Sequence, residues 1–551
     1  MASATTNYNG QRFYITGASD NSVSIWNFSE NYPRTNSVGE FQEDVLIKSL
    51  QEFVSYKTIS SRPDHAEDCR RGATFLRKLF KKYGAETEML NTDNHHNPVV
   101  FARFSGKQAT SAKRKKILFY GHYDVVGADD KKGNWIIDPF QMKGINGYLY
   151  GRGVSDNKGP IMAALYAVVD CKNEGLLDSD VVFLIEGEEE SGSRGFMEAV
   201  KRNKELIGDI DYILLANSYW LDDEVPCLTY GLRGVLHATI SVDSNHPDVH
   251  SGVDGSFMMD EPLFDLTSIL SELKGRHNHI KIPGFYDNIL PVTEAEEARY
   301  DDITDTLIRR NPELGPASAL KASLMARWRQ PNLTVHRYKV SGPEGSLVSC
   351  HASAAISLRL VPNQEVEDVI ESLKTYLNTA FQDLDTHNHL TITIDNQAEP
   401  WLGNPDNAIF QTLEKAIMEV WGPIDPPSRP SPRKDAPKPQ NAIPASPSLK
   451  PTPATANLLT NGSDHTSLAE MREPALHGDE APKGRKPLYI REGGSIPSIR
   501  FLEKEFGAPA AHLPCGQASD SAHLDNERLR LTNLFKSREI FRKVFVELPK
   551  K

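Results

Sequence analysis

The chain has 551 residues and a net charge of −12, with 25% charged and 39% hydrophobic residues. This length and composition predict a soluble globular protein of about three or four domains. The acidic balance argues against general binding of nucleic acid or of anionic membranes. No apolar run approaches the roughly 18 residues that a membrane span requires. We therefore expect neither nucleic-acid nor membrane partners.

The cysteines and one basic run bear on localisation. Five scattered cysteines contain no CxxC pair, which indicates reduced thiols rather than a disulfide framework. A dense basic run, KRKK, spans Lys113 to Lys116. It fits either a nuclear signal or, as we prefer, a solvated loop before an apolar strand. We predict a cytoplasmic protein, with the nucleus as the alternative.

Residues 1–40 precede the main body of the chain. Within residues 11–28 a strand–turn–strand pattern, with Trp26 and Asn27 near its end, resembles the last part of a WD40 propeller blade. The pattern occurs once, and one blade cannot bury its faces without neighbours. The segment is therefore either a WD40 propeller remnant of a longer protein, which we favour, or an unrelated hairpin.

Residues 41–232 alternate between helical and strand patterns, which predicts an α/β sheet with helices on both faces. The expected strands span residues 99–105, 116–126, 180–188 and 210–218. The expected helices span residues 41–57, 160–175 and 195–206.

The rhythm changes over residues 233–395, where we predict a smaller inserted α+β domain. Its expected strands are 234–244, 354–362 and 390–396, and its expected helices are 260–275 and 365–382. The α/β body resumes over 396–421 and again over 487–551. Between them, residues 422–486 are rich in proline, and we predict a disordered insertion there.

Acidic and imidazole side chains follow successive strands of the predicted body. His122 and Asp124 end one strand, Asp156 precedes the next helix, and four glutamates in the run EGEEE end the following strand. Ligands in open α/β sheets bind outside the carboxyl ends of strands, so these groups should converge. One or two divalent cations would neutralise carboxylates that otherwise repel one another.

These segments carry a specific resemblance. GHYDVV, YGRGVSDNKGP, EGEEESGS, REGGSIP and SDSAHLDNE are similar to the motifs of the M20 family of metallopeptidases, above all its dipeptidase branch. The likeness covers about residues 41–551 apart from the proline-rich insertion. It implies an M20-type catalytic domain with an inserted α+β lid that also forms a homodimer. The expected cofactor is zinc, with manganese as the alternative.

The resemblance also implies roles for individual residues. Glu189 would be the general base, and Asp124 would orient a metal-binding imidazole. The implied metal ligands are His122, Asp156, Glu190 and His523, with Asp156 between two metals.

Four further residues would contact a small peptide substrate. His250 matches a lid histidine that reaches the partner subunit's active site in the family. Arg359 matches an arginine that pairs with the substrate carboxylate, for which a planar guanidinium is suited. Ser495 matches a pocket for the same end of the substrate. Ser346 falls near another lid contact, although GSLVSCH fits the family pattern less well.

One expected ligand differs from the family pattern. Asn217 stands where the family has an aspartate that completes the His122 metal site. An amide oxygen coordinates metals but carries no charge, so we expect this site to bind more weakly.

The combination of a WD40 end, an M20 body and an insertion resembles the fungal M20 subunits of a glutathione-degrading complex. Such a subunit works with a glutamine-amidotransferase-like partner on the γ-glutamyl bond of glutathione. The favoured function is therefore metal-dependent hydrolysis of small peptides within such a complex. A catalytically weak scaffold whose partner performs the hydrolysis is the alternative, and an M20 deacylase of amino-acid metabolism is a third.

Overall fold

A computed structural model describes most of the chain. The described residues are 2–8, 11–17, 23–28, 37–93, 96–107, 114–128, 134–253, 258–342, 345–422 and 486–550. The proline-rich insertion predicted at 422–486 lies outside these ranges, except for its two end residues. None of the described helices combines the length and the hydropathy that a bilayer-spanning segment needs.

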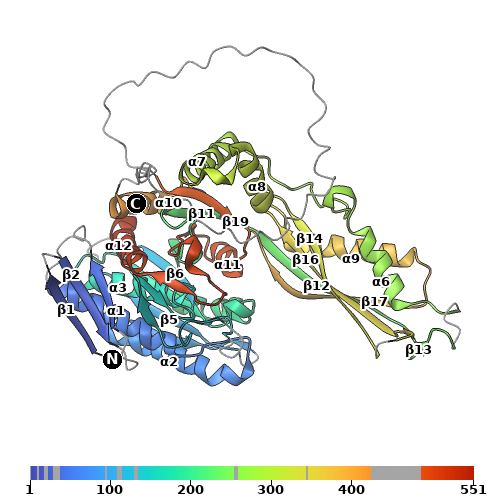
Figure 1. The fold of residues 1–551 in the computed structure, drawn as a ribbon, viewed down its shortest axis with the longest axis horizontal. Coiled ribbons are helices and arrows are strands. Elements are labelled where there is room, and N and C mark those ends of the chain that lie inside the picture. The colour runs from blue at the N-terminus through green and yellow to red at the C-terminus, as the bar shows by residue number, and fades with distance from the viewer. Residues whose placement is uncertain are drawn as a thin grey trace, which may run out of the picture. The chain divides into compact units, whose positions relative to one another are not determined.

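The N-terminal segment forms a small antiparallel sheet (Figure 1). Its strands are β1 (Ala2–Tyr8), β2 (Gln11–Gly17) and β3 (Val23–Phe28). The predicted strand–turn–strand pattern corresponds to β2 and β3, which pair from Arg12 opposite Phe28 to Gly17 opposite Val23. The sequence did not reveal β1, which pairs with β2 along its whole length.

A large mixed sheet forms the centre of the α/β body. Its hydrogen-bonded order is β18-β11-β20-β10-β6-β9-β5-β4, with β19 also paired to β11. The strands are β4 (Glu86–Leu90), β5 (Val99–Phe104), β6 (Lys116–His122), β9 (Asp180–Glu186), β10 (Tyr212–Leu215), β11 (Cys227–Leu232), β18 (Trp401–Leu402), β19 (Leu488–Glu492) and β20 (Ala510–His512). Because β6, β9, β10 and β20 are parallel, their carboxyl ends meet at one edge.

Helices cover both faces of this sheet, as neighbouring residues of β6 show. Phe119 meets Phe541 of α12 with ring centroids 5.6 Å apart, whereas Tyr120 meets Phe196 of α4 at 5.5 Å. Successive strand residues point to opposite faces, so α12 and α4 lie on opposite sides. The helices of the body are α1 (Ser37–Ser55), α2 (Ala66–Lys82), α3 (Lys158–Asn173), α4 (Phe196–Arg202), α5 (Lys204–Ile207), α10 (Ala408–Trp421), α11 (Pro497–Phe506) and α12 (Leu531–Glu547).

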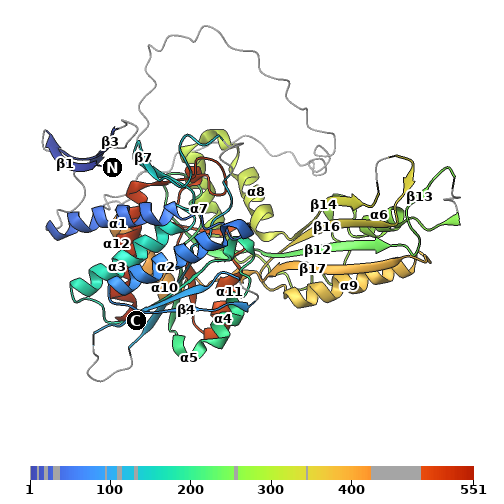
Figure 2. The ribbon, with the colours of Figure 1, turned by 90° about the horizontal axis from the view of Figure 1, so that it is seen from below.

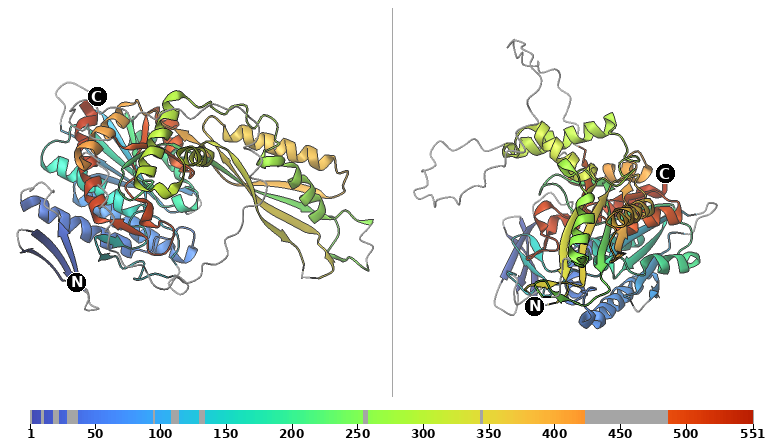
Figure 3. Two further views of the ribbon diagram at one scale, coloured as in Figure 1. Left: turned by 45° about the horizontal axis from the view of Figure 1, so that its top comes forward. Right: turned by 90° about the vertical axis from the view of Figure 1, so that its right-hand side faces the viewer.

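A second hydrophobic core lies between residues 234 and 398. Its antiparallel sheet has the order β14-β16-β12-β17, visible side by side in Figure 2. The strands are β12 (Gly234–Asp243), β14 (Asn332–Val340), β16 (His351–Leu360) and β17 (His389–Ala398). Helices α6 (Pro262–Glu272) and α9 (Val366–Gln382) pack together on one face (Figure 3). A separate two-stranded antiparallel sheet pairs β13 (Val249–His250) with β15 (Leu347–Val348).

Two helices that the sequence reading omitted pack near β19. These are α7 (Glu294–Arg310) and α8 (Ala317–Arg329). Glu296 of α7 is buried, and its Oε1 lies 2.9 Å from both Arg329 of α8 and Arg491 of β19. A buried carboxylate between two guanidinium groups ties this helix pair to the body.

Several predicted strands and helices end earlier than expected. Strand β6 ends at His122 rather than at residue 126, and β10 ends at Leu215 rather than at residue 218. Asp124 therefore lies in a loop and not on the same strand face as His122. The helix expected at 195–206 divides at Asn203 into α4 and α5. The α/β class and the alternating order are confirmed.

Candidate active site

The carboxyl ends of β6 and β9 deliver the central residues of the site. His122 is the last residue of β6, and its register partner is Glu186, the last residue of β9. After Glu186 the chain turns at Gly187, whose backbone packs against the Tyr123 ring so closely that a Cβ would clash. Glu189 and Glu190 follow in a short 3-10 turn. The turn brings both carboxylates back over the strand edge.

Asp156 lies between two imidazoles. His122 Nε2 is 3.0 Å from Asp156 Oδ1, and His523 Nε2 is 3.0 Å from Asp156 Oδ2. His523 also contacts Glu190 Oε2 at 3.2 Å, and His122 Nε2 is 4.0 Å from Glu189 Oε2. Residues more than 300 positions apart in the sequence therefore converge on one carboxylate.

Two groups of ligand atoms overlap at this place. Each group holds atoms that all lie within 4.8 Å of one another. The first comprises His122, Glu189 and Glu190, and the second comprises Asp156, Glu190 and His523. Glu190 also has a buried oxygen, Oε1, without a hydrogen-bond partner among the described residues. Imidazole and carboxylate donors around such an atom fit a divalent cation.

The pKa values of Glu189 and of the two histidines are shifted by burial and by neighbouring charges. Burial, together with the charges of Glu190 and Asp156, raises the pKa of Glu189 well above its usual range, although His122 opposes the shift. Hydrogen bonds to Asp156 and Glu190 raise the pKa of His523 to about 10. Burial alone would lower the pKa of His122, but Glu189, Asp124 and Asp156 raise it overall. The histidines and carboxylates of this site therefore shift one another's pKa values strongly.

Asp124 is fully buried and organises the loop that carries the glutamates. Its carboxylate accepts the backbone N–H groups of Glu189 at 3.2 Å and Glu190 at 3.0 Å, and the Ser60 hydroxyl at 2.7 Å. Its Oδ1 is 3.5 Å from His122 Nδ1. It therefore touches the imidazole that it was predicted to orient and also fixes the acidic turn, a contact that the sequence reading did not include.

Asn217 lies beside His122, but its amide nitrogen, and not its amide oxygen, faces the imidazole. Its Oδ1 accepts a 2.6 Å hydrogen bond from the Ser218 N–H, and its Nδ2 lies 3.4 Å from His122 Nε2. In this orientation the amide presents N–H groups to the imidazole, whereas a metal ligand would present oxygen.

The residues predicted to contact substrate lie in two other places. His250, on β13, pairs with Leu347 of β15, and Ser346 accepts a 3.0 Å hydrogen bond from the backbone N–H of Ser251. The structure thus brings His250 and Ser346 together, both exposed, at the small β13–β15 sheet. Neither belongs to the ligand-atom groups around Asp156.

Arg359 lies on β16, half-buried, and Ser495 lies in the loop after β19. Arg233 interacts with the residues around both of them. It donates to the Gly493 carbonyl at 3.2 Å, and burial followed by the charges of Arg359 and Arg327 lowers its pKa. No carboxylate in the described part of the chain forms an ion pair with any of these three arginines. This cluster is an unneutralised cationic surface beside a glycine-rich loop.

Sequence reasoning missed Glu527, although this residue ends the motif SDSAHLDNE. Glu527 is 1% exposed and accepts hydrogen bonds from the backbone N–H groups of Gly153, Ser155 and Asp156. A glutamate before a short strand normally suggests a solvated side chain. Only the fold shows that this carboxylate lies beneath the Asp156 loop.

This geometry, a mixed α/β sheet with two histidines and three carboxylates at one edge, agrees with a comparison of the sequence. The chain belongs to the peptidase family M20/M25/M40, whose model matches residues 118–450. It is therefore a member of a metallopeptidase family, as the motifs predicted.

Individual relatives agree with this assignment. The chain is 36% identical, over 97% of its length, to the probable di- and tripeptidase DUG2 of Saccharomyces cerevisiae, of which it spans only 56%. It is 28% identical to the Cys-Gly metallodipeptidase dug1 of Schizosaccharomyces pombe, over 91% of this chain and 94% of that protein. The solved structure of the dipeptidase Dug1p from Saccharomyces cerevisiae has the same fold, with a TM-score of 0.68 at 24% identity, covering 93% of this chain and 97% of that one.

Proposed function

We propose that this chain is a metal-dependent hydrolase of small peptides. The observation that carries the proposal is Asp156, which lies 3.0 Å from both His122 and His523 while Glu189 and Glu190 complete two overlapping ligand groups. Relatives named as di- and tripeptidases support it. His122, Asp156, Glu190 and His523 would hold the metal.

Each residue has a distinct task in the proposed reaction. A bound divalent ion supplies a Lewis acid that polarises the scissile carbonyl and makes water a better nucleophile. Glu189 is half-buried beside this place, 4.0 Å from His122 Nε2, where its carboxylate could accept a proton from water and pass it to the leaving nitrogen. Asp124 keeps Glu189 in position through the backbone of the turn.

Removal and return of metal tests the function directly. The chelated protein should not hydrolyse Cys-Gly or other dipeptides, and Zn²⁺ or Mn²⁺ should restore the activity. Metal must displace the proton that His523 shares with Asp156 and Glu190, so affinity should rise with pH towards about 10. Calorimetric titration and a peptide assay measure both effects. Full activity in the chelated protein would refute the proposal.

The cluster of Arg359, Arg233 and Arg327 favours a substrate with a free carboxylate. Burial, followed by the charges of Arg359 and Arg327, lowers the pKa of Arg233, and Arg233 contacts the loop that leads to Ser495. Like charges that are partly removed from water repel one another, and an anion relieves the repulsion. We infer that the C-terminal carboxylate of a peptide binds at Arg359 near Ser495.

Replacement of Arg359 by Ala should weaken catalysis on peptides with a free C-terminus. Loss of one partner of a desolvated charge pair costs about 2 kcal/mol or more, so kcat/KM should fall at least about 30-fold. For the same peptide with a C-terminal amide, kcat/KM should change little. Steady-state kinetics on both substrates check this. An equal loss of kcat/KM on the free acid and on the amide would show that Arg359 does not bind the substrate carboxylate.

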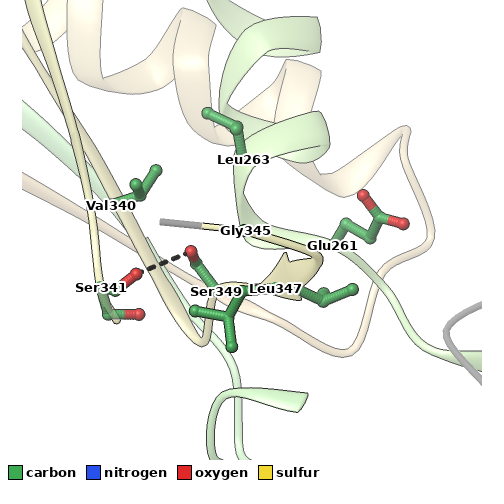
Figure 4. Close-up of a pocket in the computed structure, with 8 residues that line it drawn as sticks. Glu261, Leu263, Val340, Ser341, Gly345, Leu347 and Ser349 are labelled. Atoms are coloured by element: carbon green, nitrogen blue, oxygen red, sulfur yellow. Dashed lines mark hydrogen bonds between the residues drawn. The ribbon is translucent and has the colours of Figure 1, made fainter. Parts of the chain in front are cut away.

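We also propose that residues 233–395 act as a lid and that two copies pair through it. β14 is an edge strand, and exposed apolar residues lie on it and near α6, among them Met258, Phe264 and Val340. Phe264 is 69% exposed. A pocket beside them, shown in Figure 4, is lined by Glu261, Leu263, Val340, Ser341, Gly345, Leu347, Val348 and Ser349. Exposed apolar side chains on neighbouring elements support an interface here.

The Phe264→Asp variant should be monomeric where the wild type is dimeric. A charge placed in a desolvated interface has no partner and opposes association. Sedimentation velocity over a concentration series measures the change, and thermal melting confirms that the fold is intact. Substitution of exposed Leu524, outside the lid, should leave the dimer unchanged. A wild type that sediments as a monomer would overturn this part of the proposal.

The remaining features suggest a place in glutathione breakdown. We propose that β1–β3 is a WD40 propeller remnant that helps to dock a glutamine-amidotransferase-like subunit, and that the pair cleaves γ-glutamyl peptides in the cytoplasm. All five cysteines, each within the described ranges, are unpaired, which fits a reducing compartment. Asn217 favours the alternative of a scaffold, because its oxygen bonds to Ser218. Assays with and without the partner, on glutathione and on dipeptides, separate the two.

A further inference from the structure

Glu527 links two loops that each present a metal-ligating residue. His523, on the C-terminal loop, and Asp156, on the loop before α3, meet with 3.0 Å between imidazole and carboxylate. Glu527 follows His523 by four residues and is 1% exposed. Its side chain reaches under the Asp156 loop, so one short segment both contributes a ligand and holds the neighbouring one.

The carboxylate of Glu527 is fully used in this contact. Its Oε2 accepts from Arg152 Nη1 at 2.9 Å and from the Gly153 N–H at 2.8 Å. Its Oε1 accepts from the Ser155 N–H at 3.0 Å, the Ser155 hydroxyl at 2.9 Å and the Asp156 N–H at 3.1 Å. Hydrogen bonds to an ionised acceptor in a buried place are the strong kind. They determine the backbone position of Asp156.

The loop that carries His523 needs such support because its backbone is unfavourable. Ser521, His523 and Asn526 have φ values of +56°, +63° and +62°, in the left-handed region that non-glycine residues rarely adopt. Arg152 holds this loop as well, since its Nη2 donates to the Leu524 carbonyl at 3.1 Å. The ion pair of Arg152 and Glu527 therefore joins both loops.

We propose that Glu527 is a positioning residue that sets the distance between Asp156 and His523, and thereby the affinity and coordination geometry of the metal held by Asp156, Glu190 and His523. The inference rests on the proposed function. Glu527 does not touch the ligand atoms themselves. It acts through the backbone N–H of Asp156 and through the chain that leads back to His523.

The Glu527→Gln variant tests the role with little change in side-chain size. The amide would turn an N–H group towards backbone N–H donors and would lose the charge that pairs with Arg152. Loss of a group that orients metal ligands typically weakens metal binding by about 10–100-fold. We expect this loss for Co²⁺ binding, measured by titration, together with a changed visible absorption spectrum of the bound Co²⁺. Glu527→Asp should recover part of the affinity.

A matched variant separates positioning from general destabilisation. Asp170, on α3, is also a buried carboxylate paired with an arginine, and it accepts two 2.7 Å hydrogen bonds from Arg538 of α12. Asp170→Asn should lower the melting temperature but leave Co²⁺ affinity and spectrum as in the wild type. All titrations are run well below the melting temperature of each variant.

The outcomes distinguish this inference from the proposed function. Suppose that the wild type is a metal-dependent peptidase, and that Glu527→Gln binds Co²⁺ as tightly as the wild type and with the same spectrum. The inference about Glu527 is then wrong, while the proposed function stands. If the wild type binds Co²⁺ but hydrolyses nothing with any metal, the function fails, and the affinities of the variants still decide the inference. Equal losses in Glu527→Gln and Asp170→Asn would also overturn it, and a wild type that binds no Co²⁺ would overturn both.

Discussion

The Glu189→Gln variant should retain its metal and lose about 10²- to 10⁴-fold in kcat, the usual contribution of a general base. The side chain is half-buried beside His122, and desolvation with the charges of Glu190 and Asp156 raises its pKa. Glutamine has nearly the same shape but cannot accept the proton of water. Steady-state kinetics on a dipeptide, with metal content measured on the same samples, checks the prediction.

A neighbouring glutamate provides the control for this experiment. Glu188 is buried, but its carboxylate bonds to Asn97 and Arg194 instead of facing the ligand atoms. Glu188→Gln should therefore lower the stability of the fold while kcat keeps its order of magnitude. Unchanged activity in Glu189→Gln would leave only the scaffold, with hydrolysis performed by a partner subunit.

The Asn217→Asp variant should gain metal at the His122 site. In the wild type the Asn217 oxygen bonds to the Ser218 N–H, and the amide offers no charge to a cation. A unit charge about 4 Å from another is worth about 4 kcal/mol at an effective dielectric constant of about 20, and part of this is offset by desolvation. We expect affinity at the His122 site to rise about a hundredfold, and stoichiometry to rise from one ion towards two per chain.

Metal stoichiometry by elemental analysis, with calorimetric titration, measures this gain. Asn217→Ala is the matched control, because it removes the amide without adding charge and should leave the stoichiometry at one. Two tightly bound ions in the wild type would contradict the prediction, since they would show that an amide at this position is sufficient.

Much of the fold could be predicted because it depends on local pattern. The apolar runs around Phe119 and Phe183 are short, and this length is typical of buried strands rather than of helices. Their alternation with helical segments predicts an α/β sheet. The pattern was weaker for α7 and α8, whose short apolar stretches resemble loop sequence, and they were missed. Their packing depends on Glu296 between Arg329 and Arg491, which are distant in sequence.

The sequence by itself determined which functional groups the site contains. It showed which residues carry imidazole and carboxylate groups, that these residues follow strand ends, and that Asn217 lacks a charge. Only the tertiary structure decided how they are used. Asp124 accepts the N–H groups of Glu189 and Glu190, and Glu527 lies beneath Asp156. The physical reason is that residue type is a local property, whereas burial and hydrogen-bond partners arise from segments that the fold brings together across hundreds of residues.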